Sequence, residues 1–389
     1  MKRLAGLLSI LTLLCCIPCG AAAQEPQNWP EVIADPSAGD WIVDRFAGNS
    51  TAGPKFFQGP AREVGGLGRP GACPLPDGRV LVPFRDGLAE VDQKGTLRLV
   101  APGRFIFGTT GQVTAHVMAY NPRDGHVYAA GPNCIRRIIE KADGPWRSEV
   151  VAGMPSSKGS ADGPAKEATF GRIDSILINS RGTMFVLDDN RRIRQIENGT
   201  VTTLNATVSA GPKPMDGPLK EARFHMIGLG GNLCLADDDT LYLSDHWNFV
   251  VRKIDLKTQT VSTVAGMPKP TGNTAREKRY NRNSDGPALT WASFNSGCAY
   301  VCWDPVHQAL WCGGPDENRF RWLKDGEIRT VIGAEAGSRW DPDGLQAPAG
   351  SVRMSWNAVV AVDQQGRAYL SCSQLPHGLW RAYPQKENK

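Results

Sequence analysis

One short motif recurs along the chain and limits the folds that are open to it. Its clear copies are DGPAKEATF from Asp162, DGPLKEARF from Asp216 and DGPALTWASF from Asp285. A weaker copy, QGPAREVGGL, begins at Gln58, and a degenerate copy, DGLQAPAG, begins at Asp343. From Asp162 onward the copies are 54, 69 and 58 residues apart, and the 104 residues between Gln58 and Asp162 make two such units. Self-similarity at this period indicates a repeat architecture.

Each unit contains the same series of short strands. Segments that resemble Val-Ala-Gly precede the Asp-Gly-Pro copies, for example VVAGMP at 150–155 and TVAGMP at 263–268. Pairs of alternating apolar segments, each pair joined by a turn, follow at 73–84, 116–131, 175–188, 234–245, 300–314 and 358–372. Period-two alternation indicates strands, and the Arg-Gly, Asp-Gly and Gln-Gly pairs indicate hairpins. Six such four-stranded units predict an all-β fold, a six-bladed β-propeller.

The two ends of the repeat region are complementary. The last unit stops at GLWRAYP (378–384), a third strand with no fourth after it, and WIVDRFAG (41–48) has the character of the missing strand. An N-terminal strand that completes the last blade closes the ring and removes its open edges. We therefore predict a propeller domain over 41–384, a mobile lead-in over 24–40 and a C-terminal tail over 385–389.

Residues 1–23 have the features of a secretory signal peptide. Lys2 and Arg3 precede an apolar stretch from Leu4 to Ile17, and small residues lie before Gln24. Lipid attachment is disfavoured because no small residue stands just before Cys15, Cys16 or Cys19, the cysteines near the end of the stretch. We predict a secreted or periplasmic protein without a membrane span, since no later segment reaches 18 continuous apolar residues.

The composition of the mature chain excludes several classes. With 41% hydrophobic residues over the full sequence and no long charge block, the chain is not globally disordered. Without Lys2 and Arg3, 42 basic residues face 39 acidic ones, and a charge this close to neutral argues against nucleic acid as a partner. Seven cysteines remain and match no zinc pattern. Cys302 and Cys312 flank a predicted hairpin turn and are the best candidates for a disulfide. We expect a monomer.

The strand and turn sequences resemble NHL-repeat propellers. The resemblance rests on the segments LYLSDHWNFVVRKID (241–255) and MFVLDDNRRIRQI (184–196), together with the DGP…F and VAG motifs. It implies that Asp162, Asp216 and Asp285 accept backbone N–H groups in a connecting loop. It also implies that the aromatic ends of the three motifs pack between blades, namely Phe170, Phe224 and Phe294.

In such a propeller the loops between blades and those between second and third strands meet on one face, which we call the loop face. Ligands usually bind there, because loops vary while strands hold them. His126 and His307 fall in inner hairpin turns, so we expect them on the opposite face. The candidate binding residues of the loop face are His116, Arg172, Asp174, His225, Asp245, His246, Trp247, Trp356, Asn357 and His377.

Three functions are open for this face. Similarity to gluconolactonase-like propellers implies a calcium-dependent lactone hydrolase, with Asp174 and Asn357 as ligands, but Pro70-Gly71-Ala72 stands where that family has an acidic residue. Similarity to peptide-amidating lyases implies zinc held by converging histidines. A polysaccharide lyase or hydrolase that uses His and Arg is grouped with this second function. The third function, which we favour, is a non-enzymatic module that binds a protein, peptide or glycan.

Tryptophan content is consistent with such binding. The chain has 11 Trp, and seven of them lie between Trp291 and Trp380. Aromatic faces stack on sugars or anchor proteins, although many of these rings are expected to fill the space between blades. Trp247 and Trp356 are the best candidates for exposure.

Overall fold

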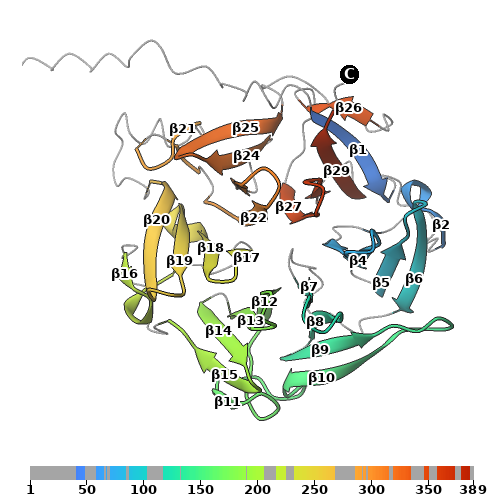
Figure 1. Ribbon diagram of the computed structural model, residues 1–389, viewed down its shortest axis with the longest axis horizontal. Helices are drawn as coiled ribbons and strands as arrows, with labels where there is room; N and C mark the ends of the chain where they lie inside the picture. The colour runs from blue at the N-terminus through green and yellow to red at the C-terminus, as the bar shows by residue number, and fades with distance from the viewer. Residues whose placement is uncertain are drawn as a thin grey trace, which may run out of the picture. The chain divides into compact units, whose positions relative to one another are not determined.

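Alternating side chains between tight turns produce six antiparallel sheets (Figure 1). The computed structural model describes residues 41–48, 58–64, 67, 71–84, 87–102, 117–131, 133–189, 191–205, 216–224, 232–267, 285–290, 292–294, 297–314, 319–333, 346–349, 357–372 and 378–385. The predicted signal peptide, the lead-in and most of the predicted tail lie outside these residues. Among the described residues, no helix has the length and apolar character that a bilayer span requires.

Each sheet is one blade. The first blade consists of β2 (Gln58–Pro60), β3 (Cys73–Pro74), β4 (Val80–Phe84), β5 (Gly87–Val91) and β6 (Thr96–Pro102). The second consists of β7 (Met118–Tyr120), β8 (Val127–Gly131), β9 (Cys134–Ile139) and β10 (Arg147–Gly153). The third consists of β11 (Gly163–Pro164), β12 (Ile173–Ile178), β13 (Met184–Asp188), β14 (Arg192–Glu197) and β15 (Thr200–Thr203).

The other three blades follow the same plan. The fourth blade consists of β16 (Gly217–Pro218), β17 (Leu233–Asp237), β18 (Thr240–Asp245), β19 (Val250–Asp255) and β20 (Thr260–Gly266). The fifth consists of β21 (Gly286–Pro287), β22 (Tyr300–Asp304), β23 (Ala309–Gly313), β24 (Arg319–Lys324) and β25 (Glu327–Gly333). The last consists of β26 (Gln346–Pro348), β27 (Asn357–Val362), β28 (Ala368–Cys372), β29 (Gly378–Pro384) and β1 (Trp41–Ala47). Three 3-10 helices are described: η1 (Ala61–Glu63), η2 (Leu219–Glu221) and η3 (His246–Asn248).

The inner strands form a closed ring. β3 contacts β7, β7 contacts β12, and contacts continue through β17, β22 and β27 back to β3. Figure 1 shows these strands near the centre, with later strands of each blade farther out. The chain is therefore a six-bladed β-propeller, as the repeats predicted.

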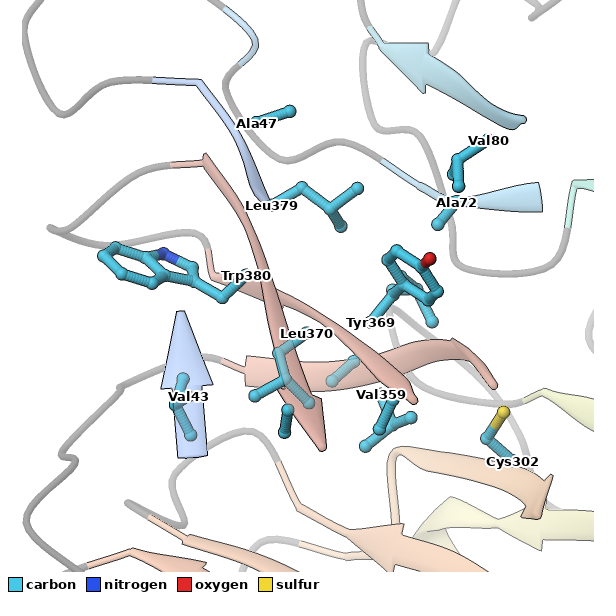
Figure 2. Close-up of a cluster of buried hydrophobic side chains, with 14 of the residues drawn as sticks. Val43, Ala47, Ala72, Val80, Cys302, Val359, Tyr369, Leu370, Leu379 and Trp380 are labelled. Carbon is cyan, nitrogen blue, oxygen red and sulfur yellow. The ribbon is translucent and has the colours of Figure 1, made fainter. Parts of the chain in front are cut away.

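The N-terminal strand closes the ring. β1 lies between β26 and β29, with Ile42 opposite Tyr383 on one side and opposite Pro348 on the other. Figure 2 shows the core at this closure, where Val43 of β1 and Trp380 of β29 belong to the same cluster as Val80 of the first blade. The predicted closure is confirmed, because the strand at 41–47 takes the fourth position of the last blade.

The Asp-Gly-Pro motif adds a fifth strand to a blade. Gly163 and Pro164 form β11, which pairs with Val201 and Thr200 at the outer edge of the third blade. β2, β16, β21 and β26 occupy the same position in four other blades. The predicted four strands are present, and within the described residues five of the six sheets have this short additional strand. The Asp carboxylates accept backbone N–H groups as predicted, at 2.8 Å from Thr203 to Asp162, 3.0 Å from Thr263 to Asp216 and 2.8 Å from Thr330 to Asp285.

The Val-Ala-Gly motif joins consecutive blades. Gly153 lies at φ +82°, where L side chains are strained, and its N–H donates to Ala165 O of the next blade at 2.7 Å. Gly266 donates to Ala288 O at 2.8 Å, and Gly48 donates to Ala61 O at 2.8 Å. Each of these bonds ties the outer strand of one blade to the Asp-Gly-Pro segment of its successor.

Three tryptophans pack at the seam between the fifth and last blades. Trp41 of β1 meets Trp311 and Trp322 edge-on, with ring centroids 5.5 Å and 5.4 Å apart, and His307 stands 5.2 Å from Trp41. All three indoles are buried. These rings fill space between blades rather than presenting a binding surface.

The proposed disulfide between Cys302 and Cys312 is wrong. Both thiols are buried and unbridged. Cys302 lies opposite Trp311, and Val301 lies opposite Cys312. Because neighbouring positions in a strand point to opposite faces, the two side chains join different core clusters and cannot meet.

Candidate functional site

The described loop-face candidates lie on the third and fourth blades. Arg172 precedes β12 and Asp174 is its second residue, while Asp245 ends β18 and is followed by His246 and Trp247 of η3. His126 and His307 occupy the β7–β8 and β22–β23 turns, on the opposite face as predicted. The remaining candidates cannot be placed in full: His116, His225, Trp356 and His377 lie outside the described residues, and Asn357 is described only as the first backbone position of β27.

Arg172 and Asp174 form an ion pair at the start of β12. The guanidinium Nε donates to Asp174 Oδ1 at 2.6 Å. The Asp174 side chain is only 2% exposed, whereas that of Arg172 is 41% exposed. A carboxylate in this environment orients the guanidinium, and the guanidinium is the part that a ligand on this face can reach.

The loop between β18 and β19 holds Trp247 in a fixed position. Asn248 Nδ2 donates to both carboxylate oxygens of Asp245 at 3.0 Å, which closes the single turn of η3. His246 Nδ1 contacts Cys298 O of the next blade at 3.2 Å, and since a carbonyl only accepts, Nδ1 carries the proton in this contact. Trp247 packs edge-on against the His246 ring, with centroids 5.1 Å apart, and is 48% exposed. Trp247 is therefore exposed as predicted.

A buried amide beneath this loop was not anticipated. Asn232, just before β17, accepts from Val301 N at 2.7 Å and donates to Val301 O at 2.8 Å. Its own N–H donates to Ser244 Oγ at 2.7 Å. Ser175 Oγ accepts from Leu233 N at 3.3 Å. These bonds connect the inner strands of the third, fourth and fifth blades at the end where Asp174 and Asp245 lie, so they stiffen the floor of the candidate site.

The third strands carry buried arginines that sequence reasoning also missed. Arg194, Arg252 and Arg321 have no exposed side-chain surface and reach the motif carboxylates of Asp162, Asp216 and Asp285. Arg194 also lies over the Phe170 ring, with Cζ 4.5 Å from the centroid, and Arg321 lies over Phe294 at 4.7 Å. A signal was present, because an Arg recurs in RRIRQI, FVVRKI and NRFRWL.

This arrangement gives Asp245 a structural role. Asp188 ends β13 as Asp245 ends β18, and it accepts from Gly171 N at 2.7 Å and from Arg194 Nη1 at 3.2 Å. Burial raises the pKa of Asp188, although Arg194 opposes that effect. In the fourth blade, burial lowers the pKa of Arg252, and Asp245 opposes that effect. Asp245 is 0% exposed and serves the loop and the blade rather than a ligand.

No metal centre is formed by the described part of the chain. Within it, no three His, Cys, Asp or Glu side chains converge as ligands for a metal ion. Gly71 and Ala72 precede β3, where the lactonase-like family has an acidic residue. A zinc site built from the candidate histidines, or a calcium site built around Asp174 and Asn357, would have to include residues outside the described ranges.

A small cavity lies on the opposite face, between the inner hairpins of the first and last blades. Its volume is about 110 Å³, and Asp363, Arg367 and Tyr369 are among its lining residues. Asp363 Oδ2 accepts from Arg367 Nε at 2.6 Å and from the Tyr369 hydroxyl at 3.2 Å, and its Oδ1 accepts two turn N–H groups. Burial and Asp363 raise the pKa of Tyr369, so the hydroxyl remains a donor. The polar groups here satisfy one another, which leaves the loop face as the better candidate.

Solved structures share this architecture. A Bacteroides thetaiotaomicron protein of unknown function gives a TM-score of 0.60 at 15% identity, over 88% of this chain and 75% of that chain. An auxiliary nutrient binding protein of the same organism gives 0.58 at 10% identity, over 89% and 77%. A putative phosphatase, also from that organism, gives 0.58 at 13% identity, over 90% and 79%. The similarity shows the fold alone.

Sequence comparisons add no family. No model of a known protein family matches the chain, and no curated protein matches it. The six-bladed propeller implied by the NHL resemblance is shown, and membership of that family stays a prediction.

Proposed function

We propose that the protein is an exported propeller that binds a protein, peptide or glycan on its loop face, with Trp247 as a principal contact. The observation that carries this proposal is the half-exposed indole on a loop whose polar groups are bonded to neighbouring blades. An aromatic ring held in place offers a large contact area at little entropic cost on binding. Arg172 adds a cation on the adjacent blade.

Two further points support binding rather than catalysis. The carboxylates of Asp174 and Asp245 are almost fully buried and bonded within the protein, so neither is presented to a substrate. One protein with the same fold is described as an auxiliary nutrient binding protein. Export is the part of the proposal that depends on residues 1–23, and recovery of an exported protein that begins at Gln24 tests it.

The binding function is tested with Trp247→Ala. The matched control is Val306→Ala, because Val306 is 49% exposed and lies in an inner hairpin turn on the opposite face. Both variants and the parent protein are screened against arrays of neutral oligosaccharides and of unstructured peptides, and hits are titrated by calorimetry. Loss of a central aromatic contact weakens binding about tenfold or more, so Trp247→Ala should lose affinity that Val306→Ala retains.

The alternative, a metal-dependent lactone hydrolase or lyase, predicts a different outcome. Elemental analysis of the purified protein would then find near-stoichiometric calcium or zinc, and chelation would lower the melting temperature. That result, or equal affinities for the two variants, would count against the proposed function.

A further inference from the structure

A second cavity lies away from the loop-face candidates, at the seam where β1 closes the ring. This closure groove has a volume of about 670 Å³. Its walls come from β1 and β29 of the last blade, and from η1 and the β5–β6 turn of the first blade. The side chains that determine its chemistry are Arg45, Phe46, Arg62, Glu63, Lys94 and Arg381. The volume is within the range of small-molecule sites and much larger than one carboxylate requires.

The groove is positively charged. Among the described residues, four cationic side chains line it, and two carboxylates, Glu63 on the wall and Asp44 behind it, leave a net charge of +2 for this set. Asp44 Oδ2 accepts from Arg62 Nη2 at 2.8 Å and from Arg381 Nη2 at 2.7 Å. One buried carboxylate therefore orients two guanidinium groups at the groove, so they are held in position before any ligand arrives.

Arg45 is a departure from the repeat. In the fourth blade Arg252 of the third strand faces Thr263 of the outer strand, and in the fifth blade Arg321 faces Thr330. In the last blade Trp380 occupies the third-strand position and Arg45 occupies the outer-strand position. The Arg45 guanidinium carbon lies 4.9 Å from the centroid of the Trp380 ring, and the residue as a whole is only 8% exposed. This exchange moves a cation from inside the blade to the strand that borders the groove.

An extended peptide is poorly suited to this place. The outermost strands of the two flanking blades, β2 and β26, have three residues each, and they end in Pro60 and Pro348. Proline has no N–H to donate, and short edge strands that contain it resist pairing with another strand. Side-chain recognition therefore has to provide the affinity. Planar guanidinium groups match carboxylates in pairs of parallel hydrogen bonds.

We infer that the closure groove binds an acidic oligosaccharide, a short chain of sugars that carry carboxylate groups. Its carboxylates pair with Arg62, Lys94 and Arg381, and Phe46 provides an apolar wall for a sugar ring. This site is independent of the loop-face function, because none of its lining residues belongs to the candidate set of that face.

The test is a calorimetric titration with a defined probe, a trimer of galacturonic acid. Arg62→Gln combined with Lys94→Gln removes two exposed cations of the groove. The matched control is Lys220→Gln combined with Lys324→Gln. Lys220 has the position in η2 that Arg62 has in η1, and Lys324 ends β24 just before the β24–β25 turn, whereas Lys94 lies within the β5–β6 turn. Both double variants lose the same charge. The groove variant should bind the trimer about tenfold or more weakly, and the control should bind as the parent does.

Other probes separate this ligand from its competitors. A neutral trisaccharide should not bind, and higher salt should weaken binding of the trimer. Equal affinity for a tri-glutamate peptide, or for monomeric galacturonate, would overturn the assignment to an oligosaccharide. So would equal loss in the two double variants, or no binding by the parent protein. Since Arg62 bonds to buried Asp44, Lys94→Gln alone serves as a second variant that leaves that bond intact.

Discussion

Replacement of Trp41 by Ala tests how much the closing strand contributes to the stability of the ring. Trp41 is 2% exposed, and its ring meets Trp311, Trp322 and His307 with centroids 5.2 to 5.5 Å away. Truncation of a buried Trp to Ala costs about 3–5 kcal/mol, a range that already includes the lost edge-to-face contacts. For a propeller of this length, that loss corresponds to a fall in melting temperature of about 4–7 °C.

The assay is urea unfolding followed by tryptophan fluorescence and far-UV circular dichroism, with Trp247→Ala as the matched control. Both variants lose one indole, but the exposed Trp247 should change the free energy of unfolding by less than about 0.5 kcal/mol. Trp41→Phe, which keeps an aromatic ring at the seam, should lie between the two. A loss below about 1 kcal/mol for Trp41→Ala, or equal losses for both alanine variants, would refute the conclusion that the aromatic seam holds the ring closed.

Two other predictions concern the repeated motifs. Gly153→Ala should destabilise the protein by about 2 kcal/mol more than Gly199→Ala, measured by urea unfolding. Both glycines have φ above +70°, but a Cβ at Gly153 would lie 2.5 Å from Asn133 O, whereas Gly199 has open space, so equal losses would contradict this prediction. Partial burial raises the pKa of Asp162, but bonds from Thr203 and Arg194 outweigh it and hold the pKa below the ordinary 3.8. The stabilisation that Asp162 contributes is therefore present above pH 3.8 and is lost as the pH falls through the lowered pKa. In Asp162→Asn the free energy of unfolding should therefore fall less steeply with pH in this acid range than it does in the parent protein. The control Asp143→Asn, at an exposed position, should fall as steeply as the parent.

The blade count and the closure could be read from the sequence because both depend on local signals. Each hairpin carries period-two alternation and a tight turn, and the Val-Ala-Gly and Asp-Gly-Pro motifs recur along the chain. Counting strands was enough to predict the closure, because the last unit lacks a fourth strand after 378–384 and one unassigned strand remains at 41–48. The Asp-Gly-Pro strand was missed, since two or three residues are too few for alternation to show.

The buried arginines were missed for a different reason. In an alternating strand an Arg is ordinarily read as a solvent-facing position, and Arg194 becomes a core residue only because Asp162 and Phe170 arrive from a loop more than 20 residues away. The proposed disulfide failed on register, because a shift of one position sends Cys302 and Cys312 to opposite faces of their sheet. Neither outcome can be obtained from spacing along the chain.

The sequence by itself determined the kind of fold, since alternation, turn residues and repeat length are properties of neighbouring residues. The tertiary structure alone decided what the polar residues do. Asp245 accepts hydrogen bonds from Asn248 and holds its loop, the Trp247 ring is exposed, and Arg45 lines the closure groove. Each of these roles depends on which distant segments lie beside the residue. The physical reason is that burial and charge pairing depend on contacts between segments that are distant in the sequence, and within the last blade those contacts join residues as far apart as Asp44 and Arg381.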